Sequence, residues 1–200
     1  MLDNLDHAMT AALRAENFDE FVRLAALAEI AHTEREERLR APGALAAAAM
    51  FYAGRGIAVF PLHPGDKRPY PGTRGFKDAT TSTDIVRAWW RNKPTSNIGV
   101  PTGHGFDVID VDGPAGYQSL ADLRETGKLP PVLARAFTPR GGMHLYVPAT
   151  GSGNAASFLP GLDYRGIGGY VVAPPSVGAN TRRYDWIEPL PVLATGAVAA

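Results

Sequence analysis

The chain contains no cysteine. Disulfide bonds, thiolate zinc sites and cysteine nucleophiles are therefore excluded, and the fold must be held together by its own core. No apolar run approaches the roughly 20 residues that a membrane-spanning helix needs. The acidic start MLDNLD is also unlike the basic end of a signal peptide. We therefore expect a soluble, cytoplasmic protein that has no membrane partner.

An excess of charge is missing as well, because 20 Lys and Arg balance 20 Asp and Glu. This balance argues against a tail that binds nucleic acid through bulk charge. It is uneven along the chain, since residues 1–50 hold five Arg against nine Asp and Glu, and the remainder therefore carries the opposite excess of four positive charges. The basic part is where we expect an anionic ligand.

The 200 residues, 45% of them hydrophobic, are enough for one substantial core or two small modules. Residues 2–40 place apolar side chains three and four apart, which predicts helix with a break at Asn17. The charged run 34–38 is typical of a solvated helix end. After Pro42-Gly43 the texture changes to short strands separated by Gly and Pro, with few helices between them. This pattern predicts an α+β fold behind a helical N-terminal segment.

The elements expected after residue 43 begin with an alanine-rich helix that ends near Gly54. A later helix, capped by Ser82 or Thr83, carries Trp89 and Trp90. These two do not share a helix face, so we expect one in the core and the other at an interface or the surface. A further helix is expected over 114–126. The predicted strands cover 56–62, 97–101, 133–138, 142–148 and 169–173, and a further strand carries the aspartates of 106–113.

The segment FDVIDVDG, residues 106–113, places three aspartates in what resembles a half-buried strand. Alternate side chains of a strand point to the same face, so Asp110 and Asp112 project together, about 7 Å apart, and Asp107 points the other way. Two such carboxylates can converge on a hard cation such as magnesium or manganese. The alternative is that these aspartates only cap the turn into the helix after Gly113-Pro114.

Two more segments carry candidate site residues. TPRGGMHLYV places Arg140 and two glycines before a strand that carries His144, and both side chains suit phosphate oxygens. GLDYRGIGGYVVAPPS places Asp163 and Arg165 ahead of three glycines. Each has a plainer alternative, since His144 also suits a structural role and Asp163 with Arg165 also suits a simple ion pair.

Together these segments supply two acids on one strand, a histidine on a second and a further acid entering a third. That set is typical of nucleotidyl transfer assisted by two metal ions, in which the ions activate a hydroxyl and stabilise the leaving pyrophosphate while basic groups hold the triphosphate. No side chain needs to attack covalently.

Five pieces of the chain, in order, resemble one known family: GIAVFPLHPGDKRP, KDATTSTDIVRAWWRNKPTSNIGVPTG, VIDVDG, GGMHLYV and LDYRGIGGYVVAPPSVG. They are similar to the bifunctional DNA primase-polymerase domain of the archaeo-eukaryotic primase superfamily, found in plasmid and phage replication proteins. The resemblance implies a catalytic sheet of RNA-recognition-motif type joined to a small α/β module. We accordingly expect a helical extension (1–45), a primase-polymerase domain (46–190, divided into 46–105 and 106–190) and a tail or linker (191–200).

Carried over by position, the resemblance implies that Asp110, Asp112 and Asp163 bind two divalent ions, magnesium or manganese, and that His144 contacts the incoming nucleotide. Arg140, Arg165 and, as a weaker candidate in the DKRP loop, Lys67 are expected to contact phosphate. Asp107 matches no metal position of the family, so we expect it to be structural.

The implied activity is template-directed DNA primase and polymerase chemistry, adding nucleotides to a primer or an initiating nucleotide during replication of a phage, plasmid or mobile element in a bacterial host. The expected partners are single-stranded DNA template, primer, nucleoside triphosphates and a helicase. Because the chain has no GxxxxGK[ST] loop, that helicase would lie further along the protein or on another one. Some relatives carry a zinc-binding insertion that helps them to prime, and a chain without cysteine cannot form the usual one. We therefore expect no zinc, and we expect extension of a primer rather than priming.

Two alternatives stay open at this stage. A non-catalytic module could bind nucleic acid or nucleotide with the same fold. A nucleotide-sugar glycosyltransferase also uses a DxD pair to hold manganese, but the downstream histidine and third acid do not belong to its pattern.

Overall fold

The computed structural model describes residues 7–9, 11–12 and 18–191, and it divides into two compact units, Met1–Ala44 and Leu45–Ala200. In the first unit, α2 (Phe18–Arg40) confirms the helix predicted there, and Glu34, Glu37 and Arg38 of its charged end are exposed. The predicted break at Asn17 lies outside the described residues. Within the described ranges, no helix combines the length and the apolar character needed to cross a membrane.

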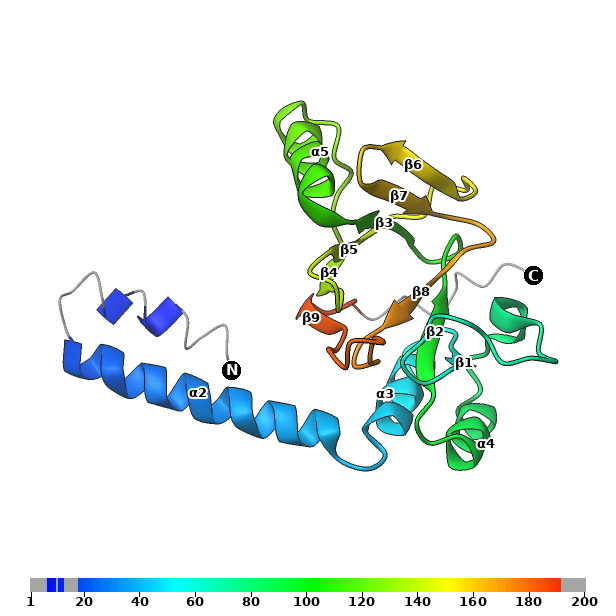
Figure 1. The fold of residues 1–200 in the computed structure, drawn as a ribbon, viewed down its shortest axis with the longest axis horizontal. Coiled ribbons are helices and arrows are strands. Elements are labelled where there is room, and N and C mark those ends of the chain that lie inside the picture. Colours follow the sequence, from blue (N-terminus) through cyan, green and yellow to red (C-terminus); the bar gives the residue numbers. More distant parts are fainter. Residues whose placement is uncertain (1–6, 10, 13–17, 192–200) are drawn as a thin grey trace. The chain divides into compact units, whose positions relative to one another are not determined.

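From Ala44 onward the chain is α+β, as predicted (Figure 1). Its helices are α3 (Ala44–Ala53), the short 3-10 helix η1 (Gly75–Asp78), α4 (Thr83–Asn92) and α5 (Gly113–Glu125). Its strands are β1 (Phe60–Leu62), β2 (Asn97–Pro101), β3 (Asp107–Val111), β4 (Ala134–Phe137), β5 (Met143–Val147), β6 (Ala155–Leu159), β7 (Leu162–Arg165), β8 (Tyr170–Ala173) and β9 (Asp185–Glu188).

The strands form two antiparallel sheets. The small sheet has the order β1-β2-β8, and the large sheet has the order β6-β7-β3-β5-β4-β9. β3 therefore lies inside the large sheet, between β7 and β5. β8 follows the large sheet's first five strands in sequence but pairs with β2, so the small sheet is not built from residues 46–105 alone.

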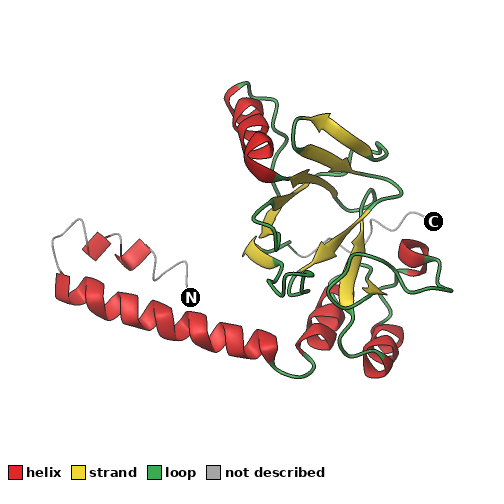
Figure 2. Ribbon diagram, viewed as in Figure 1, coloured by secondary structure: helices red, strands yellow, loops and turns green. Residues whose placement is uncertain are grey.

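One apolar cluster joins both sheets to α3 and α4, and a second packs α5 on the large sheet. The helices and the strands of the two sheets can be followed in Figure 2. Trp90 lies in the first cluster, where its indole N–H donates to the carbonyl of Ser96 at 3.0 Å. Trp89 is half-buried at the edge of that cluster. The prediction that the two tryptophans occupy different environments is confirmed.

The strand predicted over 56–62 is shorter than expected. Gly56 has a positive φ of 79°, and the N–H of Ile57 donates to the carbonyl of Tyr52 at 3.0 Å, so this part of the apolar run closes α3 instead. The sequence reading also missed β6 and β9 and did not separate β7 from the strand that follows it. β6 lies at the exposed edge of the large sheet, where no buried face imposes an alternating pattern.

β3 was expected to be half-buried, and that expectation was wrong, because all five of its residues are buried. Ile109 and Val111 face the core beneath α5, as predicted, while Val108 on the opposite face belongs to the cluster shared by the two sheets. The carboxylate of Asp110 therefore lies on a face that is itself mostly covered.

Candidate active site

The strand register brings three predicted site residues into one row. Asp110 of β3 is directly opposite His144 of β5 on one side and Asp163 of β7 on the other. Side chains that face each other in an antiparallel pair have Cβ atoms about 5 Å apart, so the three project from the same face as neighbours. The Nε2 atom of His144 lies 3.5 Å from Oδ1 of Asp110.

Asp112 follows the end of β3 and occupies the N-cap position of α5, where its backbone is still extended (φ −117°, ψ 124°). Its side chain makes no capping hydrogen bond to the helix. The alternative that this aspartate serves to cap the turn therefore finds no support. Its backbone N–H is held by the carbonyl of Gly161 at 2.8 Å, which fixes the position of the turn.

The glycine pair before β5 has a structural use that the sequence reading missed. A Cβ added at Gly142 would lie 2.3 Å from the carbonyl oxygen of Val111 and 3.1 Å from Oδ1 of Asp112. Gly142 thus lets the start of β5 pass close to the C-terminal end of β3, where Asp112 follows.

The pKa values of both carboxyls at this end of β3 are raised, although Asp110 is buried and Asp112 is exposed. Burial raises the pKa of Asp110, and the charge of Asp163 adds to this while Lys67 and Arg165 oppose it. Burial also raises the pKa of Asp112, followed by the charge of Asp110. Loss of solvent is the largest cause of the rise at both carboxyls, and repulsion between the neighbouring acids adds to it.

His144 is fully buried, and this burial lowers its pKa to about 3. The imidazole is therefore neutral at physiological pH. Its Nδ1 atom has no hydrogen-bond partner within the described part of the chain. A neutral imidazole can donate one hydrogen bond and accept another, and of its two nitrogens the Nε2 atom is the one that faces the Asp110 carboxylate.

Asp163 is already engaged. Its Oδ2 accepts from Arg165 at 2.7 Å, and its Oδ1 accepts from the backbone N–H of Ser157 at 2.7 Å. Ser157 has a positive φ of 51° and lies in an irregular part of the pairing between β6 and β7. The ion pair that was the plainer alternative for Asp163 and Arg165 is thus present in this structure.

A pocket of about 230 Å³ lies beside Asp110, between the two sheets. His144 and Arg165 line it from the large sheet, and β8 contributes Tyr170 from the small one. Lys67 reaches it from the loop after β1. The pocket therefore combines one carboxylate, one neutral imidazole and two cations.

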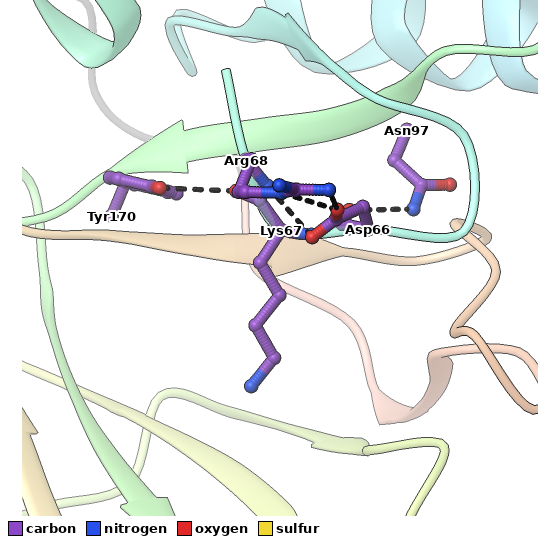
Figure 3. Close-up of polar contacts among 5 residues, drawn as sticks. All are labelled: Asp66, Lys67, Arg68, Asn97 and Tyr170. Atoms are coloured by element: carbon purple, nitrogen blue, oxygen red, sulfur yellow. Dashed lines mark hydrogen bonds and ion pairs between the residues drawn. The ribbon is translucent and has the colours of Figure 1, made fainter.

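Lys67 is held in place through its backbone (Figure 3). Its carbonyl accepts from the hydroxyl of Tyr170 at 3.0 Å, and its N–H donates to the carboxylate of Asp66 at 2.6 Å. Asn97 of β2 anchors the same loop by donating to the carbonyl of Asp66 at 3.0 Å. The Lys67 side chain extends away from these contacts, so a lysine that the sequence reading treated as a weak candidate occupies a fixed place.

Other residues depart from the predicted set. Arg140 is exposed on the turn before β5 and is not among the pocket residues. Asn154 and Tyr184 line the pocket but were missed, because neither lies in a motif and only the tertiary fold brings them there. Asp107 is buried on the opposite face of β3, where it accepts hydrogen bonds from Thr150 and Tyr164, in keeping with a structural role.

Three carboxylates, those of Asp110, Asp112 and Asp163, are the candidate ligands for a divalent ion. Magnesium is commonly held by one or two carboxylates together with substrate phosphates. Asp110 and Asp112 fit this requirement, since no described residue donates a hydrogen bond to Asp112 and Asp110 has only the 3.5 Å contact with His144. Asp163 could bind a divalent ion only if its carboxylate gave up its contact with Arg165 or with the N–H of Ser157. Across the described ranges, no three His, Asp or Glu side chains gather closely enough to hold one ion.

The raised pKa of Asp110 gives a stability prediction. A carboxyl whose pKa is raised on folding stabilises the folded state at low pH, and that contribution is lost as the pH rises through the raised pKa. At neutral pH without divalent metal, Asp110→Asn should therefore increase the melting temperature, by about 2–4 °C for each kcal/mol gained.

Asp163→Asn is the matched control for this prediction, because it removes a carboxylate that is paired with Arg165. It should lower the melting temperature at the same pH. Thermal unfolding of the two variants in EDTA would show opposite shifts, and equal or reversed shifts would contradict the environment assigned to Asp110.

Comparison with known proteins adds one finding. The family model described as bifunctional DNA primase/polymerase, N-terminal, matches residues 49–195, which include every pocket residue named above. No curated protein sequence matches the chain.

Proposed function

Because the chain belongs to the bifunctional DNA primase/polymerase N-terminal family, we propose that it extends a nucleic-acid strand on a DNA template by metal-dependent nucleotidyl transfer at Asp110 and Asp112. The observation that carries this proposal is the row of Asp163, Asp110 and His144 across three neighbouring strands, beside a pocket with two cations. DNA and nucleotides are the partners that family membership implies.

Asp110 and Asp112 are the residues that would hold a divalent ion, and Asp163 would join them on release from Arg165. When bound, such ions activate the attacking hydroxyl and stabilise the charge on the transferred phosphate. Asp110 is buried in β3, and Asp112 is exposed at the turn that follows, so a cation that neutralises the Asp110 carboxylate removes an unfavourable burial. Metal binding should therefore also stabilise the fold.

Lys67 and Arg165 are the groups that would bind the triphosphate of the incoming nucleotide. Lys67 reaches the pocket from the loop after β1 and Arg165 reaches it from β7, which allows them to fix a flexible anion from two directions. The neutral His144 would donate or accept a hydrogen bond at the same ligand, as the family resemblance implies. Both sheets are thus needed to form one nucleotide site.

Lys67→Ala should raise the KM for nucleotide about tenfold or more, because a hydrogen bond to a charged group contributes about 1.5–3 kcal/mol. Lys128→Ala is the matched control, since Lys128 is exposed beyond the end of α5, away from the pocket residues. Steady-state incorporation at varied nucleotide concentration would measure both variants. Equal KM values for Lys67→Ala, Lys128→Ala and wild type would remove Lys67 from the nucleotide site.

A further inference from the structure

Two turns outside the pocket are fastened to each other. The first is Thr138 to Gly142, before β5, and the second is Val177 to Arg183, between β8 and β9. The side-chain amide of Asn180 donates to the carbonyl of Pro139 at 2.7 Å, and a Cβ added at Gly178 would lie 2.7 Å from Cβ of Pro139. We refer to this pair of turns as the arginine double turn, after Arg140, Arg182 and Arg183.

Each turn is also closed by its own hydrogen bonds. In the first, the N–H of Thr138 donates to Gly142 at 2.9 Å, and the Tyr117 hydroxyl of α5 donates to the carbonyl of Gly141 at 3.0 Å. In the second, the N–H of Gly178 donates to the carbonyl of Arg182 at 2.8 Å. The backbones that carry the arginines are therefore well defined.

The arginines of the double turn are available to a ligand. Arg140 and Arg182 are exposed, and Arg183 is half-buried with one guanidinium N–H directed to the carbonyl of Pro175 at 3.2 Å. Among the described residues, no carboxylate forms an ion pair with any of the three. In contrast, Arg68, Arg74 and Arg165 are each paired with an acid.

The residues that follow each turn line the pocket. The first turn is followed by β5, which carries His144, and the second is followed by Tyr184, which lines the pocket with Asp110. Burial raises the pKa of Tyr184 to about 12, with the charge of Asp110 adding to this rise and that of Arg140 opposing it. The ring centroid of Tyr184 lies 5.7 Å from that of His144, so the residue after the second turn packs beside the pocket histidine.

We propose that Arg140, Arg182 and Arg183 bind the phosphate backbone of a single nucleic-acid strand and lead it toward Asp110. This inference rests on the proposed function for the choice of polyanion. The pocket cations Lys67 and Arg165 suit one enclosed triphosphate, whereas exposed guanidinium groups on adjoining turns suit successive phosphates of a chain.

The assignment differs from the sequence reading of Arg140, which placed this residue with the nucleotide ligands. Its exposure and its absence from the pocket lining favour the strand instead. Arg182 and Arg183 lie in a segment where the sequence offered no recognisable motif. Their grouping with Arg140 depends on the contact between Asn180 and Pro139.

The test is binding of a fluorescent oligothymidylate, without nucleotide or primer, followed by anisotropy over a range of salt concentrations. Removing two phosphate contacts from a single strand should reduce the slope of log K against log salt by about 1.4, since each contributes about 0.7. Arg140→Ala combined with Arg182→Ala should therefore bind about tenfold more weakly at moderate salt.

Arg124→Ala combined with Lys128→Ala is the matched control, because it also removes two positive charges from exposed positions, one on α5 and one just beyond its end. It should leave both affinity and slope almost unchanged. Thermal unfolding of each variant would show whether weaker binding comes from loss of the fold or from loss of the phosphate contacts. The inference is overturned if the double variant binds with the affinity and salt slope of the wild type.

The outcome is separable from the proposed function. Strand binding that depends on these arginines, in a protein that incorporates no nucleotide, would overturn nucleotidyl transfer and uphold the strand surface. Normal incorporation together with unchanged strand binding in the double variant would uphold nucleotidyl transfer and overturn the strand surface.

Discussion

Asp110→Asn is expected to reduce template-directed primer extension at least about a hundredfold, the scale on which loss of one preorganised electrostatic group at a reacting centre lowers kcat. The amide keeps the shape of the carboxylate but loses its charge, so it can no longer hold a divalent ion with Asp112. The same variant should be more stable than the wild type without metal, because burial opposes ionisation of Asp110.

This combination makes the prediction specific. A variant that loses activity by unfolding would lose stability as well. Asp110→Asn, in contrast, should lose activity and gain stability. The measurement is single-turnover extension of a labelled primer, with manganese and magnesium each varied. Activity within threefold of the wild type would contradict the assignment of Asp110, whatever its effect on stability.

Gly116→Ala should cause the largest loss of stability among the single substitutions considered. Alanine normally stabilises a helix relative to glycine by about 1 kcal/mol. At this position in α5, however, the added Cβ would lie 2.4 Å from the carbonyl oxygen of Gly161 and 3.1 Å from Cγ1 of Val111. Overpacking against backbone typically costs about 1–3 kcal/mol, so the net change should be destabilising.

The effect should also reach the site, because the same carbonyl of Gly161 accepts the N–H of Asp112 at 2.8 Å. Displacing it would move Asp112, and metal-dependent stabilisation should decline. Gly153→Ala is the control, since the nearest atom to its added Cβ would be the carbonyl oxygen of Ile167, at an ordinary contact distance of 4.0 Å. Urea unfolding of both variants would measure the change in stability. A Gly116→Ala protein as stable as the wild type would refute the close approach of α5 to Gly161.

Much of the fold was predictable from local pattern. The β-branched residues of β3, the amphipathic α4 and the turn residues between them encode their own structures, so these elements were found. β6 and β9 were missed because they are edge strands without a clear alternation, and part of the run after Gly54 was misassigned because Gly56 closes α3. Local pattern carries no information on which strands become edges.

The site was predictable as a set of residues but not as an arrangement. Spacing placed Asp110 and Asp112 at one end of β3, yet their alignment with His144 and Asp163 depends on strand register, which the loops and packing determine. Lys67 reaches the pocket only because Asn97 and Tyr170, both distant in sequence, hold its loop. The engagement of Asp163 by Arg165 was likewise one of two open readings.

The most direct test of the central claim is incorporation of labelled nucleotide onto a primed single-stranded DNA template by the wild-type protein, with magnesium, manganese or EDTA. We predict template-dependent extension with either metal and none in EDTA. Strand binding without any extension in either metal would contradict the claim and would identify the protein as a binding module.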